Sequence, residues 1–70
     1  MKLKEVQKIP TDGYFVVTGI SPSNFPFGVS ILAKDGIYYE YDENDDAWSD
    51  ELEDLYFNSW SDLKFFVIQY

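Results

Sequence analysis

The chain has 70 residues, of which 46% are hydrophobic and 20% aromatic, and it carries a net charge of −8. This length allows one domain, residues 1–70, and the apolar content excludes a disordered chain. The absence of cysteine and histidine excludes disulfides, thiolate metal sites and the commonest general base, and no apolar run is long enough for a membrane span. We therefore expect a globular, cytoplasmic protein with no cofactor.

The N-terminal third predicts a lead-in followed by a strand. Apolar residues three apart in residues 1–12 fit a short helical turn or an irregular segment better than alternation does. Residues 10–13, with proline, aspartate and glycine, indicate a turn. Residues 14–20 are β-branched and aromatic, which favours a strand. Residues 21–27 then form a loop in which Phe25 and Phe27 stand beside prolines. We expect these rings to fold back and close the core; the alternative is a second apolar contact point.

The middle of the chain predicts a β-hairpin. Residues 28–33 form a strand with Val29, Ile31 and Ala33 on one face, and Lys34-Asp35-Gly36 is a tight turn that requires a positive φ at Gly36. Residues 37–42 form the next strand. Here the alternation places Ile37, Tyr39 and Tyr41 inward and Tyr38, Glu40 and Asp42 outward.

The last third predicts one helix and one strand. Ser49 is a suitable N-cap for a helix that ends near Asn58, with carboxylates in its first turn. At helical spacing Trp48, Leu52, Leu55 and Tyr56 face the sheet, whereas Asp50, Asp54 and Phe57 face solvent. Residues 63–70 are apolar on both faces, which indicates a central strand. The sequence thus predicts an α+β fold: a three- or four-stranded antiparallel sheet in β-β-β-α-β order with one helix packed on it.

Charge is distributed very unevenly along the chain. Residues 35–63 contain eleven carboxylates and no cation, and all five cations of the chain are lysines. A chain without arginine and with this charge is not expected to bind DNA or RNA directly. Carboxylates can steer a basic protein partner, and aromatic side chains among them can anchor it. The predicted partner-binding residues are Asp42, Glu43, Asp45, Asp46, Trp48, Asp50, Glu51, Glu53, Asp54 and Phe57.

As a whole chain, this short, cysteine-free, acidic and aromatic-rich sequence resembles the small inhibitors encoded by phages and mobile elements, such as DNA-mimic anti-restriction and anti-CRISPR proteins. The resemblance extends to the class and to no motif. It implies that the chain occupies a basic groove of a host nucleic-acid-binding protein by charge mimicry. The alternative from composition is a solvated acidic surface on an accessory protein that self-associates, for example as a homodimer.

A calcium-binding module is a second alternative. Oxygen-bearing side chains occupy positions 1, 3, 5, 9 and 12 of a calcium loop in residues 42–53, namely Asp42, Asn44, Asp46, Asp50 and Glu53. The sixth position is Ala47, where the loop requires glycine, so our preferred interpretation contains no metal. No Ser-His, Cys-His or phosphate-binding glycine motif is present, and we expect no enzymatic activity and no membrane contact.

Overall fold

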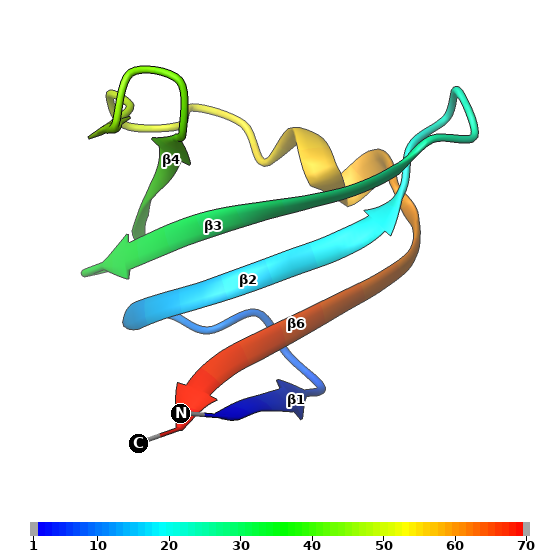
Figure 1. Ribbon diagram of the computed structural model, residues 1–70. Coiled ribbons are helices and arrows are strands. Elements are labelled where there is room, and N and C mark those ends of the chain that lie inside the picture. Colours follow the sequence, from blue (N-terminus) through cyan, green and yellow to red (C-terminus); the bar gives the residue numbers. More distant parts are fainter. Residues whose placement is uncertain (1, 70) are drawn as a thin grey trace.

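The structure, a computed structural model, describes residues 2–69, which form one six-stranded antiparallel sheet in the order β1-β6-β2-β3-β4-β5 (Figure 1). Its strands are β1 (Lys2–Val6), β2 (Gly13–Ile20), β3 (Pro26–Lys34), β4 (Ile37–Asp42), β5 (Ala47–Trp48) and β6 (Ser61–Gln69). Within the described residues the one helical element is the 3₁₀ turn η1 (Tyr56–Ser59). The predicted α+β fold, with three or four strands and a packed helix, is therefore wrong.

The β3–β4 hairpin forms as its sequence predicts. Asp35 and Gly36 have φ values of 54° and 80°, so both central residues of the turn are left-handed, as a type I′ turn requires. Glycine adopts this conformation without steric cost, and aspartate tolerates it. The observed β4 has the predicted bounds, and the predicted strands 14–20 and 28–33 lie within β2 and β3.

The two chain ends pair with each other. β6 lies inside the sheet between β1 and β2, as its two-sided apolar pattern predicts, although Tyr70 of the predicted strand is outside the described residues. β1 replaces the helical turn predicted for the lead-in and runs antiparallel to β6, from Lys2 opposite Gln69 to Val6 opposite Phe65. The buried backbone of an interior strand needs partners on both sides. β1 supplies the hydrogen-bonding partners on the second side of β6.

Alternation along the strands divides the sheet into two faces. We call the face that carries the core the covered face. Its most buried residues are 0–1% exposed, namely Phe15, Val17, Ile31 and Ala33. Phe57, from the segment that crosses this face, is 0% exposed. The burial of Ile31 and Ala33 confirms their predicted inward placement. The alternate residues form the open face, where no side chain is fully buried: Tyr14, Val16, Ser30, Leu32, Phe66 and Ile68.

The predicted facing of β4 is inverted. Tyr38 pairs with Ala33, packs edge-on against Phe15 at 6.1 Å between ring centroids, and donates a hydrogen bond to the Pro10 carbonyl at 3.0 Å. Tyr38 and Glu40 therefore lie on the covered face, whereas Tyr39 and Tyr41 belong to the open face. Tyrosines stand at three positions of this strand, so its hydrophobic pattern does not distinguish the faces. The packing of Tyr38 against Phe15 decides which face of the sheet each residue of β4 occupies.

Residues 49–60 cross the covered face as an extended segment with one 3₁₀ turn, where the sequence predicts a helix (Figure 1). The Ser49 N–H donates to the Glu40 carbonyl at 2.8 Å, and the Leu52 N–H donates to the Tyr38 carbonyl at 2.9 Å. A helix would satisfy its own backbone and leave these β4 carbonyls without partners. A helix would also bring the Asp50 and Asp54 carboxylates next to each other on one face, because residues four apart are neighbours on a helix, and like charges there destabilise it.

Candidate protein-binding surface

The predicted acidic residues begin in the connection between β4 and β5. Asp42, Glu43, Asp45 and Asp46 are all exposed. The Asp42 carboxylate accepts the backbone N–H groups of Asn44, at 2.9 Å, and of Asp45, at 3.4 Å. Asp46 has a φ of 50° and accepts a hydrogen bond from the Tyr41 hydroxyl. Local bonds of this kind hold the loop in one shape, so its charges have defined positions.

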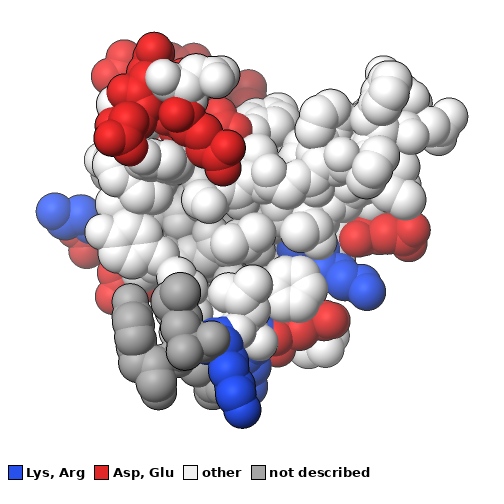
Figure 2. All heavy atoms as spheres, viewed as in Figure 1, with Lys and Arg blue, Asp and Glu red and all other residues white. Residues whose placement is uncertain are grey.

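The remaining predicted carboxylates follow on the segment that crosses the covered face. Leu52 and Leu55 of this segment pack against the core, and the carboxylates between and beside them are exposed: Asp50, Glu51, Glu53 and Asp54. Figure 2 shows acidic side chains gathered at the end of the molecule where the β4–β5 connection lies. We call the eight carboxylates of residues 42–54 the acidic surface. The structure thus brings the predicted acidic residues together without the predicted helix.

The two predicted aromatic anchors lie elsewhere. Phe57 is 0% exposed and forms part of the core, so its placement toward solvent is wrong. Trp48 is 39% exposed, but it packs on the open face against Tyr14 and Tyr41, at 5.8 Å and 5.2 Å between ring centroids. The predicted packing of Trp48 beside Leu52 is therefore also wrong. Both errors follow from applying α-helical spacing to residues 48–58, where Trp48 belongs to β5 and Phe57 to the 3₁₀ turn η1.

Tyr56 is a further exposed aromatic residue, two positions after the last carboxylate of the acidic surface. Its side chain is 43% exposed, and its hydroxyl donates a hydrogen bond to the Glu40 carboxylate. Partial burial, followed by this hydrogen bond and the negative charge of Glu40, raises the pKa of Tyr56. The phenol therefore stays neutral and remains a donor throughout the physiological pH range.

The five calcium-loop positions lie on a β-hairpin and the segment after it. Two of them, Asp42 and Asp46, already accept hydrogen bonds from the protein. Within residues 2–69 no three acidic side chains are arranged to hold a metal ion. Calcium requires six to eight oxygens converging on one point, and the calcium-binding alternative stays a prediction for the metal titration described below.

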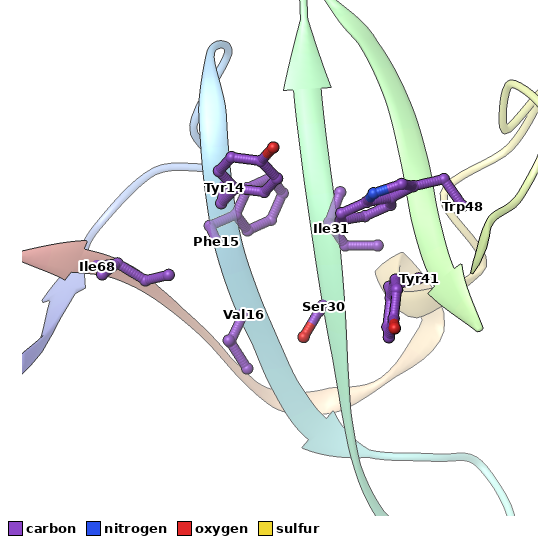
Figure 3. Close-up of a pocket in the computed structure, with 8 residues that line it drawn as sticks. All are labelled: Tyr14, Phe15, Val16, Ser30, Ile31, Tyr41, Trp48 and Ile68. Atoms are coloured by element: carbon purple, nitrogen blue, oxygen red, sulfur yellow. The ribbon is translucent and has the colours of Figure 1, made fainter. Parts of the chain in front are cut away.

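Sequence reasoning missed the open face as a candidate surface. Tyr14, Trp48 and Tyr41 surround a hollow of about 280 Å³ whose floor includes Val16 and Ser30 (Figure 3). Tyr14 is 54% exposed. The available signal was the β6 pattern, which is apolar on both faces although only one face is covered. Ser30 is a second signal, because a small side chain between the larger Val16 and Tyr41 leaves a depression in the surface.

A second aromatic group consists of Phe25, in the loop between β2 and β3, and Phe27, at the start of β3. Phe25 and Phe27 are 61% and 48% exposed, so the prediction that they close the core is wrong. Phe27 stacks on Trp60 at 5.6 Å between ring centroids. The Ser21 hydroxyl accepts the N–H groups of Ser23 and Phe25, which orders the loop. The alternative of an apolar contact point stays a prediction.

Comparisons with protein-family models, with curated proteins and with solved structures find no match. Among the described residues no helix is long and apolar enough to cross a membrane. The function must therefore be argued from the surfaces of this chain alone.

Proposed function

We propose that this protein binds a basic surface of another protein through its acidic surface. The observation that carries the proposal is the run of eight exposed carboxylates at residues 42–54 with no lysine or arginine among them. A surface selected for solubility alone normally mixes both signs, because interspersed cations relieve the repulsion. A surface of one sign instead attracts a partner of the opposite sign and accelerates its association.

The acidic surface is also preorganised for binding. Ser49 connects it to β4 twice, since its N–H donates to the Glu40 carbonyl and its Oγ accepts the Glu40 N–H at 3.1 Å. Leu52 and Leu55 fix the following segment to the core. Carboxylates that are already in place lose little conformational entropy on binding, so more of the electrostatic attraction remains as affinity.

The most fitting partner is a protein whose groove normally receives nucleic acid. Such a groove is lined with lysine and arginine that contact phosphates at regular intervals. Closely spaced carboxylates on a fixed hairpin can occupy the same positions, and the protein then acts as an inhibitor by charge mimicry. A chain without cysteine suits the reducing cytoplasm, where we place this activity.

The experiment compares two double variants of equal charge against partners captured from a bacterial lysate and then purified. Asp50→Lys with Asp54→Lys removes charge from the acidic surface. Glu5→Lys with Asp12→Lys makes the same change at exposed positions in β1 and before β2. We expect the first variant to bind at least about tenfold more weakly through a slower on-rate, and the second to bind nearly as the wild type does.

Two further measurements complete the test, namely the salt dependence of binding and competition by DNA. Wild-type affinity should fall as salt rises, and duplex DNA should compete with the protein for the partner. Equal binding by the wild type and the Asp50→Lys, Asp54→Lys variant at low salt would show that the acidic surface is only solvated. Binding that DNA does not displace would exclude mimicry while retaining an acidic docking surface.

A further inference from the structure

The open face of the sheet is a largely apolar surface, and among residues 2–69 the Trp48 ring packs over its Tyr14 and Tyr41 end while the rest of the face carries no covering segment. One row across this face consists of Phe66, Val16, Ser30 and Tyr41: Val16 pairs with both Phe66 and Ser30, and Tyr41 follows Glu40, which pairs with Ile31. A second row, Ile68, Tyr14 and Leu32, lies beside it. An antiparallel sheet normally exposes a polar face, so two apolar rows indicate that a partner packs here.

The accessible area of the chain supports this. A folded monomer of 8.2 kDa is expected to expose about 4,500 Å². This chain exposes 5278 Å², an excess of roughly 750 Å². A specific interface of standard size buries about 800 Å² on each partner. The excess, summed over the whole chain, is therefore as large as one side of such an interface.

We propose that a second copy of this chain covers the open face, and that the two sheets form a sandwich with a two-fold axis running along the strands between β2 and β3. In the order β1-β6-β2-β3-β4-β5 this axis places β6 of each copy over β4 of the other. Phe66 then lies over Tyr41 and its neighbour Trp48 of the second copy, and Val16 over the small Ser30. The bulky ends of each row thus face each other, and the depression at Ser30 receives Val16.

Charge supports this axis at the level of single residues. Lys64 pairs with Thr18, Thr18 pairs with Gly28, and Gly28 lines a hollow with Glu43, in the turn after β4. Lys64 and Glu43 are both exposed, and continuing the β3–β4 register beyond the Ile31–Glu40 pair places Glu43 opposite Gly28, at the other end of this third row from Lys64. The same axis places Lys64 of each copy over Glu43 of the other, which gives two opposite-charge pairs.

The other in-plane axis is disfavoured. A two-fold axis perpendicular to the strands would place β4 over β4 and bring the acidic edges of the two copies to the same side of the sandwich. The like charges of residues 42–54 would then repel across the interface. The axis along the strands separates the two acidic edges. It also leaves Asp50 and Asp54 free for the proposed partner, because they lie on the segment that crosses the covered face.

The test measures mass by sedimentation equilibrium over a range of concentrations. We expect the wild type to rise from 8.2 kDa toward twice that mass. Lys64→Glu and Glu43→Lys should each weaken dimerisation on the order of tenfold, because each creates two like-charge contacts, and the double reversal should restore it. Lys4→Glu changes the charge as Lys64→Glu does, but Lys4 pairs with Val67 on the covered face. It should leave the dimer intact.

A third variant tests the apolar row. Val16→Lys places a charge next to the axis in both copies and should give a monomer, with folding checked by circular dichroism. If this variant fails to fold, the charge-reversal series, which alters only exposed residues, still decides. A wild type that is monomeric at every concentration overturns the proposal. A dimer that Lys64→Glu and Lys4→Glu weaken equally, or that neither weakens, also overturns it, because the contact would then lie elsewhere.

Discussion

The two faces of the sheet are built from similar side chains but have different surroundings. Phe15 and Val17 on the covered face are 0–1% exposed, whereas Tyr14 and Val16, which alternate with them along β2, remain accessible. The difference arises from residues 49–60, which cross one face and not the other. Burial of apolar area stabilises a fold roughly in proportion to the area removed from water. The covered face therefore supplies most of the stability, and the open face is available for contact.

The largest expected effect tests this division with one kind of substitution at two sites. Phe57→Ala removes a ring that is 0% exposed, and we expect a loss of about 3–5 kcal/mol in the free energy of unfolding. Phe25→Ala removes a ring that is 61% exposed and should change stability by about 0.5 kcal/mol or less. Urea denaturation of both variants measures the difference. Equal losses would mean that residues 49–60 do not complete the core.

A second prediction concerns the closest approach of the covering segment to the sheet. A Cβ at Gly19 would lie 2.9 Å from two atoms of Trp60, so Gly19→Ala should destabilise by about 1–3 kcal/mol through overpacking. Gly28→Ala, in the neighbouring strand, is the control, because its nearest contact would be Thr18 at 3.6 Å. Thermal unfolding should separate the two. A harmless Gly19→Ala would show that Trp60 packs less closely there.

A third and smaller effect links the covering segment to β4 through pH. The pKa of Tyr56 is higher in the folded state than its ordinary value of 10.0, because of partial burial and the Glu40 carboxylate. The stabilisation is therefore fully present below about pH 10 and decreases as pH rises above it. Tyr56→Phe should cost about 1 kcal/mol at neutral pH and reduce the loss of stability in alkali. Denaturation of both proteins from pH 7 to 11 measures this, and parallel curves would contradict it.

The smallest expected effect concerns metal. Calcium at millimolar concentration should raise the melting temperature no more than magnesium does, because Asp42 and Asp46 are already bonded within the hairpin. The measurement is a thermal melt with each ion and with chelator. A saturable rise specific to calcium would support the calcium-binding alternative and weaken the comparison of a stabilising face with a contact face.

Local signals determined the central part of the fold. The Asp35-Gly36 turn and the alternation of residues 28–33 specify a hairpin, because two-residue turns accept few conformations and a register shift would expose Ile31. The two-sided apolar pattern of β6 also indicated an interior strand. The clustering of charge in residues 42–54 was evident from the sequence. All of these features depend on neighbours in the chain.

Tertiary structure alone decided the rest. Phe57 is buried and Phe25 is exposed, although both are phenylalanines next to an asparagine. Residues 49–58 fit helical spacing, yet residues 49–55 form no helix because the β4 carbonyls of Glu40 and Tyr38 accept the N–H groups of Ser49 and Leu52. β1 forms because β6 needs a second neighbour. Such pairings join residues far apart in the chain, and their energy exceeds the weak local preferences that a sequence pattern expresses.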